Sequence, residues 1–306
     1  MSILKRALAS ALVACTVAGA AFAASGDYGA WSTAVRVESI SGTPVDFNGA
    51  ALDGCPFVSR DGKTFYMASA RAGGLGGIDI WVSTRASEND PWGSPVNVGP
   101  PVNSSANDFC PTISRDGHLF YFVSNRAGGC GGDDIYTTRL RPDGWDPVQN
   151  LGCDVNSAAN EASPFPLLER ADGPVLYFSS TRAGTSDLYR STSHGDVFGP
   201  AAPVSELNSP TAQDGHPNLR RDGLEIFFFS TRPGGVGAQD LYSSTRSSVA
   251  VPWSTAVNLG PAVNSSAADT RPSLSWDGTT LYFGSTRAGG DGDSDHYVTT
   301  REREEP

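Results

Sequence analysis

The sequence predicts an all-β protein, a five-bladed β-propeller whose four-stranded blades close into a ring. Three observations predict this fold. The 306 residues include 35 Gly and 21 Pro, a composition typical of turn-rich β structure, and no segment after the first two dozen residues has the period of an amphipathic helix. One unit of sequence recurs five times. The segment near the N-terminus repeats a segment that the last unit lacks.

Each recurring unit begins with an acidic residue three positions before a proline, and these acids stand 53 to 55 residues apart. Such a fixed period indicates a repeat array. Each unit also carries an Asp-Gly turn and a glycine loop, which runs from an arginine through glycines to an aspartate. The acids are Asp53, Asp108, Glu161, Asp214 and Asp269, the loop arginines are Arg71, Arg126, Arg182, Arg232 and Arg287, and the loop aspartates are Asp79, Asp134, Asp187, Asp240 and Asp295.

The segments between these marks predict four strands per unit. In the second unit, "PTIS" leads into the Asp-Gly turn, "LFYFVS" follows it, "DIYTTRL" follows the glycine loop and "WDPVQNLG" closes the unit. Four short strands in about 40 to 50 residues are typical of a propeller blade. The slightly longer period here leaves room for the glycine loop.

The last unit stops after its third strand, and the missing strand stands near the N-terminus. The segment "WSTAV" at Trp31–Val35 repeats Trp253–Val257 letter for letter. We therefore expect the N-terminal strand to complete the fifth blade, which removes two open sheet edges. This closure predicts a single domain over residues 24–306 with no internal linker.

The pattern "DxxPxxSxDGxxLYFxSxRxGGxGxxDIY" resembles the WD40-like β-propeller repeat of the TolB-like propeller family, which occurs in exported bacterial proteins. The resemblance extends from Trp31 to about Arg301 and implies a propeller. For function it implies a binding module, a scaffold or an accessory propeller, because the repeat occurs in all of these. The best-known propeller of the family has six blades, so partner binding does not carry over to five.

Residues 1–23 read as an export signal, with Lys5 and Arg6, an apolar run and "AFA" as the cleavage site. The other interpretation is a lipoprotein signal, because "LVAC" resembles a lipobox that would make Cys15 a lipid anchor. No transmembrane segment is expected once the signal is removed. The chain is thus predicted to be periplasmic or secreted, or else lipid-anchored in the cell envelope.

Charge and cysteine content limit the candidate partners and predict disulfide bonds. The chain has 22 Lys and Arg against 33 Asp and Glu, a formal net charge of -11, which argues against nucleic acid and anionic membranes as partners. Cys55, Cys110, Cys130 and Cys153 follow the signal, and an even number in an exported chain predicts two disulfides. Four cysteines allow three connectivities, and the sequence leaves the choice open: a Cys130–Cys153 bridge would pin one glycine loop, and Cys55 with Cys110 could join neighbouring inner strands. The other interpretation is a four-thiolate metal site.

The residues that recur in every unit are expected to be structural, since each is needed once per blade. We expect the loop arginines and loop aspartates to form a buried network. In it an arginine contacts the aspartate across the glycine loop, or the acid of a neighbouring blade. The large apolar residues of the closing strands are expected to anchor adjacent blades; they are Trp31, Trp92, Trp145, Trp253 and Phe198.

The residue two positions after each acid does not recur, which makes it the strongest site signal in the sequence. It is Cys55, Cys110, Ser163, His216 or Arg271. We expect His216 and Arg271, with Asp214 and Asp269, to form a ligand-binding pocket at the mouth of the central channel. Asp53, Asp108 and Glu161 complete the acidic ring there. The other interpretation is tolerated variation at an exposed position.

No nucleophile elbow, zinc-protease motif or phosphate loop is present, so no catalytic residue is assigned. The sequence predicts a monomeric binding or scaffolding propeller whose partner is an envelope protein or a glycan. The alternative is a lectin or glycoside hydrolase that uses the acidic ring, because such hydrolases need two carboxylates about 5 to 10 Å apart. No cofactor is expected, although Asp291, Asp293 and Asp295 alternate as in a calcium loop.

Overall fold

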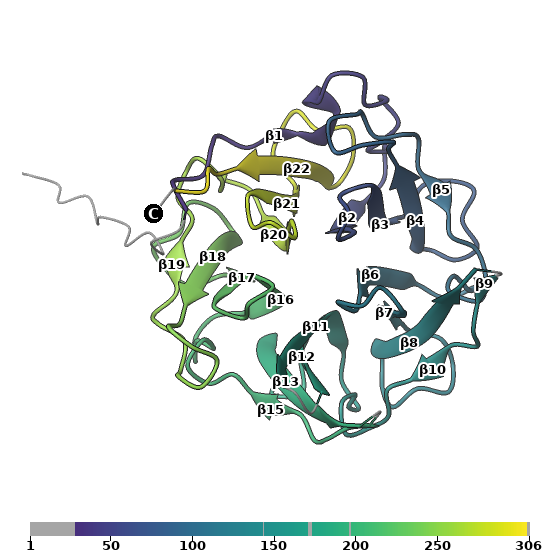
Figure 1. The fold of residues 1–306 in the computed structure, drawn as a ribbon, viewed down its shortest axis with the longest axis vertical. Coiled ribbons are helices and arrows are strands. Elements are labelled where there is room, and N and C mark those ends of the chain that lie inside the picture. The colour runs from purple at the N-terminus through teal and green to yellow at the C-terminus, as the bar shows by residue number, and fades with distance from the viewer. Residues whose placement is uncertain (1–27, 143, 171–172, 196, 305–306) are drawn as a thin grey trace, which may run out of the picture.

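Five blades surround a central axis in the computed structural model, which describes residues 28–142, 144–170, 173–195 and 197–304 (Figure 1). Its regular structure is all β apart from one short turn of 3-10 helix, η1 (Val37–Ser39). The predicted propeller of five four-stranded blades is therefore confirmed. No helix within the described ranges is long and apolar enough to cross a membrane.

Within each blade the first strand is innermost and the next strands follow outward, joined as antiparallel neighbours. Blade 1 is β2 (Asp53–Val58), β3 (Thr64–Ser69), β4 (Asp79–Thr84) and β5 (Val96–Asn97); blade 2 is β6 (Asp108–Ile113), β7 (Leu119–Ser124), β8 (Asp134–Arg141) and β10 (Gln149–Asn150), with β9 (Gly144–Trp145) also on β8. Blade 3 is β11 (Glu161–Arg170), β12 (Gly173–Ser180) and β13 (Asp187–His194), with β14 (Val197–Phe198) and β15 (Ala202–Pro203) both on β13. Blade 4 is β16 (Asp214–Leu219), β17 (Glu225–Ser230), β18 (Asp240–Thr245) and β19 (Val257–Asn258); blade 5 is β20 (Asp269–Leu274), β21 (Thr280–Ser285), β22 (Asp295–Thr300) and β1 (Val35–Arg36).

The N-terminal strand closes the ring, as the repeated "WSTAV" segment predicts. Strand β1 lies antiparallel along the outer edge of β22, with Val35 opposite Val298 (Figure 1). Nearby, both terminal nitrogens of Arg301 donate to the carboxylate of Glu225 in blade 4, at 2.8 and 2.7 Å. Blade 5 is thus completed by one end of the chain and joined to blade 4 by a buried ion pair.

Apolar side chains fill the spaces between adjacent blades. Phe65 of blade 1 meets Tyr282 of blade 5 edge to face, with ring centroids 5.3 Å apart, and Leu176 and Phe178 of blade 3 pack with Tyr121 of blade 2. Aromatic pairs in this geometry add to the free energy gained from burial. The core is therefore a set of five inter-blade layers.

Every innermost strand runs between the two faces of the disk. It starts at the acid, on the face that carries the glycine loops, and ends at the Asp-Gly turn on the other face, as in β6 between Asp108 and the turn at Asp116. We call these the glycine-loop face and the turn face. Any ligand at the channel therefore approaches one or the other.

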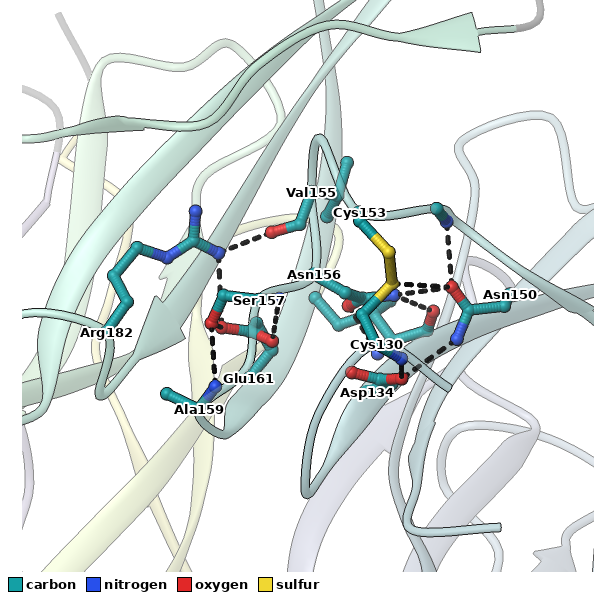
Figure 2. Close-up of a disulfide and its surroundings, with 12 residues drawn as sticks. Cys130, Asp134, Asn150, Cys153, Val155, Asn156, Ser157, Ala159, Glu161 and Arg182 are labelled. Carbon is teal, nitrogen blue, oxygen red and sulfur yellow. Dashed lines mark hydrogen bonds and ion pairs between the residues drawn. A yellow bond between two sulfur atoms is a disulfide. The ribbon is translucent and has the colours of Figure 1, made fainter. Parts of the chain in front are cut away.

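The two disulfides that the cysteine count predicts are present, and the structure gives their pairing. Cys55–Cys110 joins the innermost strands of blades 1 and 2. Cys130–Cys153 joins the glycine loop of blade 2 to the segment that follows β10 (Figure 2). The alternative of a four-thiolate metal site is excluded, because all four sulfurs are used in these two bonds.

Candidate functional site

Each loop arginine forms an ion pair with the acid of its own blade. The nitrogen–oxygen distances lie between 2.6 and 3.1 Å, and all five acids are fully buried. The expected contact across the glycine loop, or with a neighbouring blade, is wrong. In the hairpin the start of the first strand lies opposite the end of the second, as Asp108 lies opposite Ser124. An arginine two residues after the second strand therefore faces the acid of the same blade.

The same groups bind the segment by which the chain enters the blade. Arg126 donates to the Asp108 carboxylate at 2.7 Å and to the carbonyl of Val102 at 2.5 Å. Asp108 also accepts hydrogen bonds from the backbone and hydroxyl of Ser104. Figure 2 shows the equivalent cluster in blade 3, where Glu161 and Arg182 lie beside Ser157. Each acid is therefore buried in contacts with its own blade and with the segment that enters that blade, and none lines the pockets of the channel.

The loop aspartates of blades 1, 2, 4 and 5 accept hydrogen bonds from the backbone of their own glycine loops. Asp134 accepts a hydrogen bond from the backbone nitrogen of Cys130 at 2.5 Å and another from Asn150 at 3.1 Å (Figure 2). In blade 5, Asp295 accepts from the backbone of Asp291 at 3.0 Å, and the Asp291 carboxylate pairs with Arg36. No group of three or more His, Cys, Asp or Glu residues in the described ranges is placed to hold a metal ion.

The five variable residues sit at a β-bulge in each innermost strand, where all five adopt left-handed backbone with φ between 48 and 57°. Non-glycine residues rarely do so, and such residues cluster at functional positions. Together with the prolines that follow, they surround a channel waist of about 30 Å³. The disulfide fills one side, and Ser163, His216 and Arg271 occupy the rest.

A polar pocket of about 230 Å³ opens beside His216 and Arg271 on the glycine-loop face. Asn160, Thr181, Ser186 and Gln239 are among the residues that line it. It brings together the two variable residues that the sequence singled out, on the adjacent blades 4 and 5. Their companions Asp214 and Asp269 do not line it.

Blade 3 contributes Ser186 to the pocket from an unusually short glycine loop. Arg182 and Asp187 stand five positions apart, whereas the matching pair stands eight apart in every other blade. Elsewhere this loop packs onto the segment that enters the next blade, so closely that Gly76 has no room for a Cβ beside Ala106. The short loop was not among the predicted site features, although its length is visible in the sequence.

Arg271 is the positively charged side chain among the described residues that line the pocket. Arg271 forms no ion pair within the described part of the chain; its guanidinium packs on Gly54 and donates only to Thr270, at 3.3 Å. Burial lowers the pKa of Arg271, yet an arginine remains charged at neutral pH. Burial and the Arg271 charge hold the pKa of His216 well below its usual range. His216 is therefore a neutral hydrogen-bonding group beside a cation.

One carboxylate near the pocket has no arginine partner among the residues that the structure describes. Asp187 follows Ser186, a lining residue, and is half-buried. Burial, and then the charge of Asp214, raise the pKa of Asp187. The short loop of blade 3 lacks the backbone donors that bind the other loop aspartates, so no such hydrogen bond holds the Asp187 carboxylate.

A larger cavity, of about 600 Å³, lies on the turn face. Its walls are mainly apolar, and Trp276 stands at its edge. The residue before Asp-Gly is Arg60, Arg115 or Arg221 in three other blades and Trp276 in blade 5. That replacement is visible in the sequence, but Trp276 was not among the predicted site residues.

The fold is similar to propellers of two kinds. TolB from Acinetobacter baumannii is 18% identical with a TM-score of 0.50, over 83% of this chain and 56% of that one, so the chain spans little more than half of that protein. Putative TolB from Agrobacterium tumefaciens is 16% identical with a TM-score of 0.51, over 91% and 100% of the two chains. The catalytic domain of the GH62 α-L-arabinofuranosidase from Coprinopsis cinerea is 15% identical with a TM-score of 0.59, over 90% and 98%.

No family model matches the sequence, and no curated protein matches it. At these identities the structural likenesses show the fold alone. They confirm the resemblance that the repeated motif predicted: the chain has the fold of a TolB-like propeller, which it shares with glycoside hydrolases.

Proposed function

We propose that the protein is a non-enzymatic binding propeller of the bacterial cell envelope that holds an anionic group at the glycine-loop face. Arg271 supplies the charge, and His216 supplies a neutral polar contact. The observation that carries the proposal is the guanidinium of Arg271, which faces a pocket without a carboxylate partner in the described ranges. The five loop arginines, by contrast, are each paired with a buried acid.

The size of the pocket limits what enters it. A volume of about 230 Å³ is below the 300 to 1,000 Å³ of typical ligand sites. It suits one substituent of a larger molecule, such as the carboxylate arm of an acidic sugar. An arginine binds a carboxylate through two parallel hydrogen bonds, which gives orientation as well as affinity.

Calorimetric titration with a matched pair of sugars tests the proposal. N-acetylmuramic acid carries a carboxylate, and N-acetylglucosamine is its neutral counterpart. We expect the acidic sugar to bind the parent protein and the neutral one to bind at least about tenfold more weakly, because a hydrogen bond to a charged group contributes roughly 1.5 to 3 kcal/mol. Arg271→Gln should abolish the preference, and Arg271→Lys should keep part of it.

Arg190→Gln is the control, because Arg190 is exposed and lies outside the pocket. Equal affinity of Arg271→Gln and the parent for N-acetylmuramic acid would contradict the role of Arg271. If neither sugar binds the parent, fragments of peptidoglycan and extracted envelope proteins with acidic segments are the next ligands to titrate.

Asp187 favours one alternative, a glycoside hydrolase with its active site in the same pocket. A general acid needs a raised pKa, and burial gives Asp187 one. The known α-L-arabinofuranosidase of similar fold suggests nitrophenyl α-L-arabinofuranoside as the substrate to try. Hydrolysis by the parent that is lost in Asp187→Asn would favour this alternative. Binding of N-acetylmuramic acid without hydrolysis of any glycoside would favour the binding module.

We further propose that the protein is exported, which the two disulfides support because such bonds persist in oxidising compartments. The signal at residues 1–23 and the lipid-anchor alternative at Cys15 lie outside the described residues. Palmitate labelling of the whole chain in cells separates them. Label that disappears in Cys15→Ala indicates an anchor, and an unlabelled protein that begins at Ala24 indicates a soluble periplasmic or secreted form.

A further inference from the structure

The turn-face cavity is built like a binding site, although no predicted function depends on it. Its volume of about 600 Å³ falls within the range of small-molecule sites. Phe57, Ile113, Phe165, Leu219 and Leu274, from all five blades, are among its apolar walls. The narrow waist separates it from the pocket of His216 and Arg271. A ligand here would be independent of one on the glycine-loop face.

Basic and aromatic side chains gather at the edge of this cavity. Arg60 and Arg115 both lie over the ring of Trp276, with guanidinium carbons 5.0 and 5.9 Å from its centroid. Arg221 lines the cavity from blade 4. All three arginines are exposed, and none forms an ion pair within the described ranges. These three arginines place positive charge at the cavity, although the chain as a whole is acidic.

The two carboxylates that also line the cavity are occupied by their own turns. Asp61 accepts hydrogen bonds from the hydroxyl of Ser59 and the backbone of Lys63, and the Ser59 contact lowers the pKa of Asp61. Asp116 does the same within its turn. Among the described residues that line the cavity, three arginines stand against these two aspartates, which leaves a net positive charge. The arginine donors have no acceptor in the described part of the chain.

We propose that the turn-face cavity binds a small amphipathic carboxylate, whose apolar body fills the cavity and whose carboxylate meets Arg60 and Arg115 at its edge. Apolar walls favour the body by removing it from water. A guanidinium favours a carboxylate over a neutral head group of similar size. The cavity is lined by all five blades and its volume suits a small molecule, so a folded protein domain does not fill it.

Decanoate is the probe, with decanol as its uncharged counterpart and acetate as its head group alone. Titration calorimetry at low ionic strength should show decanoate binding, decanol at least about tenfold weaker, and no measurable acetate binding. The affinity for decanoate should fall as salt is added, because the arginines are exposed to solvent.

Two double variants with the same loss of charge locate the site. Arg60→Gln with Arg115→Gln should weaken decanoate binding at least about tenfold and remove its preference over decanol. Arg190→Gln with Arg303→Gln removes two exposed arginines that do not line the cavity and should leave the affinity unchanged. Arg271→Gln should leave it unchanged too, which separates this result from the proposed function.

Tryptophan fluorescence gives a second readout. Decanoate should change the emission of the parent, and Trp276→Phe should remove that change while calorimetry still detects binding. The proposal is overturned if the parent binds no decanoate, if decanol binds equally well, or if the Arg60 and Arg115 variant binds like the parent. Emission changes that persist in Trp276→Phe would place the site elsewhere and overturn it as well.

Discussion

Arginine has two different roles in this chain, and the backbone position decides which. A loop arginine follows the second strand of its blade and lies beside a buried acid. Arg271 stands at a bulge with left-handed backbone, so its side chain enters the channel instead. Of these two positions, only the second leaves the guanidinium without a carboxylate partner among the described residues.

Removing one acid of the ring should show how much the structural pairs contribute. Asp108→Asn keeps the shape of the side chain but leaves Arg126 without its counter-charge. We expect the free energy of unfolding to fall by about 3 to 5 kcal/mol, the usual cost of breaking a buried ion pair from one side. Urea unfolding measures it. Asp146→Asn, at an exposed pair, should leave the midpoint unchanged, and equal midpoints for all three proteins would contradict the structural role.

His296 is a buried histidine at a position where the other blades have Ile or Leu. Burial lowers its pKa to about 4, and Asp53, Arg71 and Arg271 are the charged groups around it. The unfolded chain therefore takes up a proton near pH 6.5 that the folded chain refuses until about pH 4. The neutral, buried His296 therefore makes its full contribution to the free energy of unfolding above pH 6.5. This contribution falls by roughly 3 kcal/mol as the pH drops from 6.5 to about 4.

His296→Leu should remove this part of the pH dependence. Unfolding midpoints measured between pH 7 and pH 4 should fall less steeply in the variant than in the parent. His216, whose pKa burial also lowers, keeps part of the slope. His194→Leu, at an exposed position, should retain the full slope of the parent. Parallel curves for parent and His296→Leu would show that His296 is not the group responsible.

At the scale of elements, the sequence predicted the repeated strands better than the side-chain contacts between them. Repeat spacing predicted the strands, and the even number of cysteines predicted two disulfides without their pairing. Repeat spacing did not give the partner of each loop arginine, because that partner follows from hairpin register. The short loop of blade 3 was visible as the spacing of Arg182 and Asp187. That the longer loops pack onto the segment that enters the next blade could not be predicted, because that contact joins residues of different units.

The two disulfides should differ in their contribution to stability. Cys55–Cys110 spans 55 positions and Cys130–Cys153 spans 23. Cross-links restrict the unfolded chain more when they close longer loops, by about 4 kcal/mol for the first and about 3 kcal/mol for the second. Replacing both cysteines of each pair by alanine should therefore lower the urea midpoint more for Cys55 and Cys110. A larger fall for Cys130 and Cys153 would contradict the loop-entropy explanation.

At the scale of the whole molecule, the five blades and their closure could be predicted because both appear in the sequence as repeated segments. The two cavities could not be predicted. They depend on the bulge that turns Cys55, Ser163, His216 and their counterparts into the channel and makes a waist. Positive φ at non-glycine residues has no signature in the local sequence. The sequence therefore predicted the variable position of the site but not the direction in which its side chains point.

Ring closure makes the N-terminal strand a test of the whole fold. Strand β1 covers the outer edge of β22. Tyr28 and Trp31 lie against the guanidinium of Arg301, which is 4.1 and 4.5 Å from their ring centroids. A chain that begins at Val37 loses these contacts and exposes the backbone donors and acceptors of β22. We expect its free energy of unfolding to fall by at least about 3 kcal/mol, the usual cost of removing a large buried aromatic residue.

The same shortened chain should self-associate, because an unpaired strand at the edge of a sheet offers a template for another chain. Urea unfolding gives the stability, and light scattering gives the mass in solution. A chain that begins at Tyr28 keeps β1 and serves as the control, which should stay monomeric with the midpoint of the mature protein. A chain from Val37 that remains monomeric and unfolds at the same midpoint would mean that the ring does not depend on its fifth-blade closure.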